Sequence, residues 1–223
     1  MKVNYQLEME RELARIPEDG PRPRLLLHSC CAPCSSYVLE TLTPSFDIDA
    51  FYYNPNIAPR VEFDRRVEEL ERLATALPHE NALRVIVGDY DSAAFMELCR
   101  GHEHDPEGGA RCELCFRMRL GASARMAARL GCDYYTTSLT ISPLKNAGLL
   151  NAIGEELGRR EGVRWLWSDF KKKNGYKRSC ELSREYGLYR QDYCGCVFSR
   201  LKRDARLRAM AAERANAGDN GPM

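Results

Sequence analysis

The sequence of 223 residues lacks long apolar runs and has almost no net charge, and both features narrow what the protein can be. Its longest apolar runs, such as residues 25–27 and 85–87, are far shorter than the roughly 20 residues that a membrane-spanning helix needs. We therefore expect no membrane partner. The net charge of +1 gives no global signature of nucleic-acid binding, so any attraction to phosphate has to come from local clusters of basic residues.

An export signal is a second missing feature. Residues 1–16 mix acidic and basic side chains, with no positively charged start leading into an apolar stretch and no small-residue cleavage site. A secreted disulfide scaffold is also disfavoured, because such chains are usually short and lack an apolar core, whereas this 25.4 kDa chain is 44% hydrophobic. We expect a cytoplasmic protein whose thiols stay reduced and available to metals.

Cysteine, in contrast, is abundant. The sequence contains 10 cysteines, and most of them fall into tight groups. These groups are Cys30, Cys31 and Cys34; Cys112 and Cys115; and Cys194 and Cys196. Such clustering indicates bound metal and thiol redox chemistry. The isolated Cys99 and Cys132 lie in apolar segments and are expected to pack in the core, while the roles of Cys34 and Cys180 stay open.

Cys112 and Cys115 form half of a metal site, because a spacing of three places both sulfurs on one face of a helix. The second CxxC or His pair of a structural zinc site is absent at the usual spacing, so the best partners are Cys30 and Cys31. Adjacent side chains on an extended segment point to opposite sides, which suits an iron-sulfur cluster better than one zinc ion unless the turn bends sharply. A zinc-stabilised RNA-binding module without redox activity remains the alternative.

Cys194 and Cys196 flank Gly195 on one short segment. A disulfide across a single residue would be strained, and strain makes the bond exchangeable, as a catalytic or relay dithiol requires. Spacing alone does not exclude that these two are further metal ligands.

Alternating patterns along the chain predict an α/β fold, with a Rossmann-like, mostly parallel sheet, flanking helices and a helical C-terminal segment. Strands are expected at residues 24–29, 48–53, 83–87, 133–138 and 163–167, and helices at 5–16, 35–42, 59–77, 92–100, 112–130 and 144–160. We expect an N-terminal extension over 1–23, a single catalytic domain over 24–210 and a disordered tail over 211–223. Ligands bind beyond the carboxyl ends of such strands, where residues 30–31, 53–56 and 138–146 would share one crevice.

Four segments together resemble the cobalamin-independent epoxyqueuosine reductases: 28–34 (HSCCAPC), 112–115 (CELC), 137–146 (TSLTISPLKN) and 187–196 (GLYRQDYCGC). Residues 169–176 (DFKKKNGY) also fit, and the resemblance covers roughly 25–200. It implies removal of the epoxide oxygen from epoxyqueuosine at the wobble position of tRNA, with the anticodon stem-loop as partner. It further implies a [4Fe-4S] cluster on Cys30, Cys31, Cys112 and Cys115 and a redox-active pair at Cys194 and Cys196. The presence of a second iron, the electron donor and the oligomeric state stay undetermined.

A tRNA substrate gives the basic residues of the C-terminal part a role, because phosphate contacts need Lys and Arg without base specificity. One group comprises Lys171, Lys172, Lys173, Lys177 and Arg178, and a second comprises Arg200, Lys202, Arg203, Arg206 and Arg208. Tyr176, Tyr189 or Trp167 could stack on an unpaired base. His28, Tyr193 and Asp192 are the candidate proton donors for the leaving oxygen.

Overall fold

The computed structural model describes residues 3–17 and 19–218. Its elements, in chain order, are α1 (Tyr5–Leu13), β1 (Arg24–His28), α2 (Ala32–Leu42), β2 (Asp47–Tyr52), α3 (Arg60–Ala76), β3 (Leu83–Val87), α4 (Ser92–Leu98), α5 (Ala110–Leu130), β4 (Tyr134–Thr137), the 3₁₀ helix η1 (Ser138–Ile141), α6 (Ala147–Glu161), β5 (Arg164–Trp165), α7 (Gly175–Glu185) and α8 (Val197–Gly218). The predicted α/β class is confirmed.

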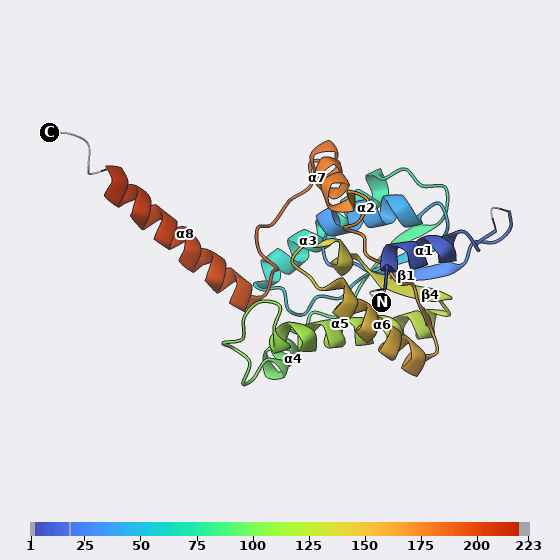
Figure 1. Ribbon diagram of the computed structural model, residues 1–223, viewed down its shortest axis with the longest axis horizontal. Helices are drawn as coiled ribbons and strands as arrows, with labels where there is room; N and C mark the ends of the chain where they lie inside the picture. The colour runs from blue at the N-terminus through green and yellow to red at the C-terminus, as the bar shows by residue number, and fades with distance from the viewer. Residues whose placement is uncertain (1–2, 18, 219–223) are drawn as a thin grey trace.

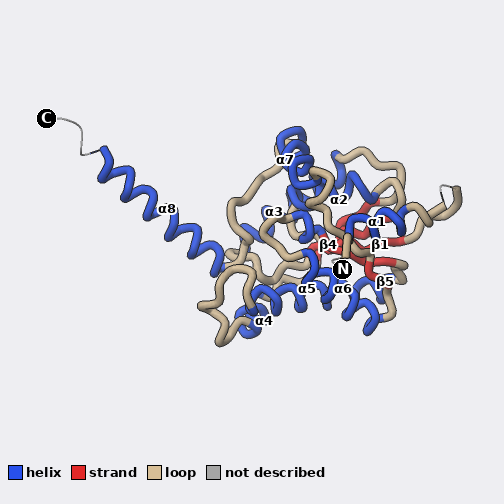
Figure 2. The backbone as a smooth tube through the Cα atoms, in the orientation of Figure 1, coloured by secondary structure: helices blue, strands red, loops and turns tan. Residues whose placement is uncertain are grey.

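The strands form one parallel sheet in the order β3-β2-β1-β4-β5. Figure 2 shows the strands in red, with helices around them. The chain starts in the middle at β1, builds outward through β2 and β3, and then returns to the other side of β1 with β4. The strand order therefore reverses between β1 and β4, and loops leaving these two strands diverge to opposite faces. This is the position at which open α/β sheets bind ligands.

Helices cover both faces of the sheet (Figure 1). Successive residues of β1 alternate between the two apolar cores, as the pleat requires: Leu25 and Leu27 pack with α2, while Leu26 packs with α5 and α6. These side chains are completely buried. Because both faces of β1 are covered, its sequence is a continuous apolar run. The packing on both faces fixes the position of its carboxyl end, where the chain continues to Cys30 and Cys31.

Several element ends differ from the predicted ones. The expected strand over 133–138 ends at Thr137, because the Thr137 side chain accepts a hydrogen bond from Leu139 N and caps η1. The expected helix over 144–160 starts only at Ala147, where the side chain of Asn146 accepts from Leu149 N. The last strand shrinks to Arg164–Trp165 at the edge of the sheet.

The two terminal segments behave differently from each other. Met9 of α1 is 1% exposed and belongs to the main apolar core, so this part of the predicted N-terminal extension packs on the domain. At the other end, α8 continues as a helix to Gly218, past residue 211, where the tail is predicted to begin. Residues 219–223 of that tail lie outside the described residues. Within 3–17 and 19–218, no helix is both long and apolar enough to cross a membrane.

Candidate active site

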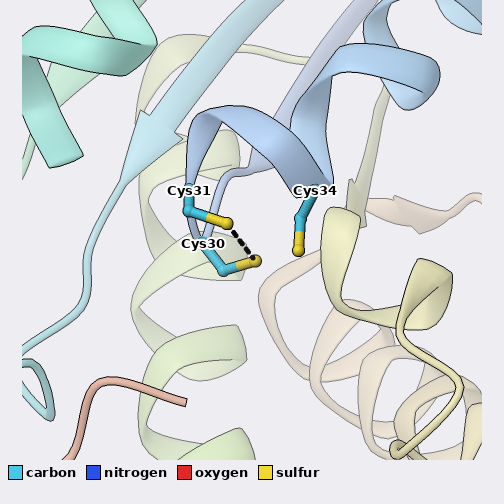
Figure 3. A group of neighbouring side chains, drawn as sticks. All are labelled: Cys30, Cys31 and Cys34. Carbon is cyan, nitrogen blue, oxygen red and sulfur yellow. Dashed lines mark hydrogen bonds between the residues drawn. The ribbon is translucent and has the colours of Figure 1, made fainter. Parts of the chain in front are cut away.

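The turn from β1 into α2 gathers three thiols. The Sγ atoms of Cys30, Cys31 and Cys34 all lie within 4.8 Å of one another, and those of Cys30 and Cys31 are 3.9 Å apart (Figure 3). The sharp bend that the sequence left open is present, so Cys30 and Cys31 do not point to opposite sides. The strand has already ended at His28 and Cys31 is the N-cap of α2, so the backbone bends between the two residues. Three sulfurs this close can bind one metal centre.

Electrostatics give these three thiols unequal charge. Hydrogen bonding with Cys31 and Cys34 lowers the pKa of Cys30 well below its usual value, and the nearby cations Arg119 and Lys145 lower it further. The same contact with Cys30 raises the pKa of Cys31 to about 12. Cys30 N–H also donates to Ser138 Oγ at 3.1 Å, which fixes the cysteine at the point where β1 and β4 diverge. The thiolate, which is the form that binds metals, is therefore favoured at Cys30 over Cys31.

Cys112 and Cys115 lie in the first turns of α5 and share one helix face, as their spacing predicts. Cys115 is buried, and this burial raises the pKa of its thiol to about 12. Cys112 Sγ accepts a hydrogen bond from Gly108 N at 3.2 Å. Neither sulfur belongs to the close group of Cys30, Cys31 and Cys34, which is the one such group of metal-ligating side chains in the described part of the chain.

Cys194 and Cys196 are held by backbone contacts across the molecule. Ala58 N donates to Gly195 O at 3.0 Å, and Arg66 Nη1 donates to Cys194 O at 3.2 Å. Gly195 has φ +111°, and a Cβ atom there would lie 2.8 Å from Arg66 Nη1. Glycine is required here because of both the left-handed backbone and the close approach of the guanidinium.

Two adjoining cavities connect these cysteine groups. The larger one has a volume of about 670 Å³ and is lined by Cys30, Cys31, Cys34 and Cys194. The smaller one, of about 30 Å³, is lined by Cys112, Cys115, Cys194 and Cys196. Cys194 and Lys145 line both. The structure therefore brings all six predicted site cysteines, together with Cys34, to the walls of two cavities that share Cys194.

Buried cations surround the thiols, and sequence reasoning missed the most important of them. Arg119 is 2% exposed, hydrogen bonds to Asn54, and its Nη1 lies 3.9 Å from Cys115 Sγ. Burial opposes its charge, but the thiols of Cys115 and Cys30 outweigh this and raise its pKa. One signal was available: Arg119 follows Cys115 by four residues, so both share a face of α5.

The lining of the larger cavity is strongly basic. Its charged side chains are seven cations and two carboxylates: Arg66, Arg119, Lys145, Arg190, Lys202, Arg203 and Arg206 against Glu107 and Asp192. Burial disfavours the ammonium of Lys145, yet the thiols of Cys194 and Cys30 raise its pKa. Arg119 Nε, Asn56 Oδ1 and Gln191 Oε1 are buried on the cavity walls without a hydrogen-bond partner in residues 3–17 and 19–218. Such walls fit a polar, negatively charged occupant.

The other residues predicted for the site divide between the larger cavity and positions away from it. His28 is fully buried, its Nδ1 is 2.7 Å from Thr137 Oγ1, and burial lowers its pKa to about 3, so it is a neutral structural residue. Tyr193 and Asp192 do line the larger cavity, as does Tyr176. Trp167 instead lines a separate pocket with Glu8 and Glu12. Cys99 and Cys132 are buried, which confirms their packing role, and Cys180 is a partly exposed residue of α7.

Fold and site together define a class: an α/β protein with a reactive centre of clustered thiols, balanced by buried cations, at the switch point of a parallel sheet. Comparison with known proteins narrows this class. Residues 25–202 match the model of the family described as "Epoxyqueuosine reductase QueH". The chain is 42% identical over 205 residues to the epoxyqueuosine reductase QueH of Staphylococcus epidermidis, covering 90% of this chain and 86% of that protein.

Two further relatives carry the same name. The protein of Streptococcus pyogenes is 40% identical over 200 residues, with 89% of this chain and 78% of the relative covered. The protein of Thermotoga maritima is 35% identical over 182 residues, with 80% and 91% covered. This chain belongs to the QueH family of epoxyqueuosine reductases. The resemblance drawn from the sequence motifs is thereby confirmed, and the zinc-binding alternative gains no support.

Proposed function

We propose that this chain reduces the epoxide of epoxyqueuosine, at the wobble position of a tRNA, to the cyclopentene of queuosine. Family membership supports the reaction, and one structural observation carries its assignment to this site: Cys194 lies on the wall shared by two cavities that hold the other site cysteines. A volume of about 670 Å³ is within the range of small-molecule pockets and admits a modified nucleoside.

The reaction needs two electrons and two protons. Both carbon–oxygen bonds of the epoxide break, a carbon–carbon double bond forms, and the oxygen leaves as water. The thiols of Cys194 and Cys196 can supply both electrons and both protons by forming a disulfide, and an external reductant then restores the dithiol. Gly195 favours this role because its positive φ permits a sharp backbone bend between the two cysteines, which lie on one short segment.

A [4Fe-4S] cluster is the proposed cofactor, held by Cys30, Cys31, Cys112 and Cys115. The residues fit such a group: they offer thiol ligands, Arg119 balances negative charge between the two cysteine pairs, and the buried Arg119 Nε–H donor lacks a partner in the described chain. When bound, a cluster supplies iron as a Lewis acid and one-electron redox chemistry. Cys34 offers one more thiol beside this set, which leaves a place for a second iron.

The remaining residues of the cavity walls bind the substrate and donate protons to its departing oxygen. Lys145 lines both cavities and stabilises negative charge that develops on the departing oxygen. Its Nζ and the hydroxyl of Tyr193 are the proton donors that the cavity offers, whereas His28 is buried below it. Tyr176, on the wall and 41% exposed, is placed to stack on a base at the entrance.

One anaerobic experiment tests the proposal. Protein purified without oxygen, or reconstituted with iron and sulfide, is incubated with epoxyqueuosine-bearing tRNA and a chemical reductant, and the nucleosides are then analysed by mass spectrometry. We expect a brown protein and conversion of epoxyqueuosine to queuosine. A colourless protein that contains zinc and leaves the epoxide intact would contradict both the cofactor and the activity.

A further inference from the structure

Helix α8 projects from the body of the protein into solvent (Figure 1). Its 22 residues make it about 33 Å long. Residues 205–213 are exposed without interruption. Apolar packing does not hold this part of the helix, so what it does has to be sought in its charge.

Cations dominate α8. Between residues 200 and 208 it carries five cations and a single carboxylate, Asp204. Arg203 pairs with Asp192 and Asp204, each at 2.8 Å. Within residues 3–17 and 19–218, Arg200, Lys202, Arg206 and Arg208 form no ion pair. Four positive charges on one projecting helix are thus left for an external anion.

The basic segment around α7 is a different case. Lys171 pairs with Asp169 at 2.6 Å, and Lys173 pairs with Glu10 at 2.5 Å. Arg178 lies between Glu40, Glu181 and Glu185. Carboxylates of the protein itself already balance most of the charge that made this segment a predicted phosphate site. The structure therefore shifts the strongest unbalanced basic surface from α7 to α8.

The charge of α8 is continuous with that of the active site. The helix begins at Val197, directly after Cys196, and Lys202, Arg203 and Arg206 line the larger cavity. That cavity already has a large excess of cations over carboxylates. A nucleotide whose base enters the cavity leaves its flanking phosphates at the entrance, where α8 starts. From there the helix leads outward, in the direction that the rest of a bound RNA must take.

We propose that α8 is a docking arm for the phosphate backbone of the tRNA anticodon stem. This inference rests on the proposed function, which requires the wobble nucleotide to reach the cavity. A second copy of this chain is a poorer occupant. Of the exposed apolar residues of α8, Leu207 and Met210 share one helix face, whereas Leu201 lies nine residues before Met210 and so on the opposite side. A pair of residues within a single turn is too short a stripe to pair with another helix. The family match ends at residue 202, so it includes only the first turns of α8.

The test measures binding of an unmodified tRNA transcript as a function of KCl concentration, so it does not depend on turnover. The variant Arg206→Gln/Arg208→Gln removes two cations and keeps good helix formers. The matched control, Lys173→Gln/Lys177→Gln, removes two cations next to and within α7 that already pair with Glu10 and Glu181. We expect the salt dependence, log K against log [KCl], to become less steep by about 2 for the α8 variant and to stay unchanged for the control. Arg206→Lys/Arg208→Lys should retain the slope of the unsubstituted protein.

Three outcomes would overturn the arm: an unchanged slope in the α8 variant with circular dichroism showing intact helix, an equal loss in the α7 control, or a dimer that dissociates in the α8 variant while RNA binding is unaffected. Failure of the proposed function has a different signature, namely no epoxide reduction by the unsubstituted protein at saturating tRNA. If α8 docks the tRNA as proposed, the α8 variant should also show a raised KM for the tRNA.

Discussion

Two charged clusters lie at opposite ends of the sheet, and they differ in whether the protein completes them. At the amino end, Asp49 of β2 is 5% exposed and bonds to Arg24 and Arg84. Cys132 Sγ also lies 3.7 Å from this carboxylate. At the carboxyl end, Arg119 and Lys145 face thiols across open cavities. The first cluster is closed by protein atoms, whereas the second needs an external group.

This difference separates two uses of buried charge. A closed cluster stabilises the fold, because each charge has its partner and removal of one leaves the others uncompensated. An open cluster produces a strong electrostatic field in a cavity, and this field can stabilise charge on a bound cofactor or substrate. Substitutions at the carboxyl end should therefore change chemistry more than stability, and substitutions at the amino end should do the reverse.

The largest effect is expected for Cys194→Ser. The variant keeps the size of the side chain but cannot form a disulfide with Cys196, so epoxide reduction should fall at least about a thousandfold. Iron content and the melting temperature should stay as in the unsubstituted protein. The matched control is Cys180→Ser on α7, which should retain activity. Loss of iron in Cys194→Ser would instead make Cys194 a metal ligand.

The opposite result is expected at the amino end for Asp49→Asn. Arg24 and Arg84 then lose the carboxylate between them, and the free energy of unfolding should drop by about 2 kcal/mol, since both arginines can still reach solvent. Iron content and the rate of epoxide reduction per folded molecule should not change. Denaturant titration together with iron analysis checks this. A loss of iron without a loss of stability would show that the two clusters are not independent.

The sequence predicted the fold and the site only in part. The strand and helix alternation and the cysteine spacings are local patterns, and they correctly predicted the parallel sheet and the gathering of thiols at its carboxyl edge. The bend at Cys30 and Cys31 was left open by the sequence, because where a strand ends depends on its pairing with β2 and β4.

The cations of the site were missed for a related reason. Arg119 bonds to Asn54, 65 residues away along the chain, and Arg66 bonds to Cys194 O, 128 residues away. Glu62 and Arg66 are four residues apart on a charged helix, a spacing that is usual for solvent-exposed ion pairs, yet Arg66 is 2% exposed. Contacts between segments so distant leave no periodic pattern, so only the folded chain reveals them.

His28 offers a smaller test, because it lies directly below the open cluster but belongs to the closed interior. Its pKa is lowered to about 3 in the folded protein, so between that value and the unfolded pKa near 6.5 only the unfolded chain takes up the proton. The contribution of His28 to the free energy of unfolding is therefore fully present above pH 6.5. It falls as the pH drops toward 3, by roughly 1.4 kcal/mol per pH unit. Relative to His28→Gln, the unsubstituted protein should show this extra slope in denaturant titrations between pH 6 and 4.5.

The smallest effect is expected for Gly195→Ala, which asks whether Arg66 positions the dithiol or merely packs beside it. Alanine at φ +111° is strained by about 1 kcal/mol, and its Cβ would lie 2.8 Å from Arg66 Nη1, so the segment must shift and carry Cys194 with it. We expect a loss of about 1 kcal/mol in stability and of roughly tenfold in turnover. Gly187→Ala is the matched control, since Gly187 also has a positive φ of +56° but nothing within 4 Å of an added Cβ. If both variants lost turnover equally, backbone strain alone would explain the effect, and Arg66 would have no part in aligning Cys194 with the cavity.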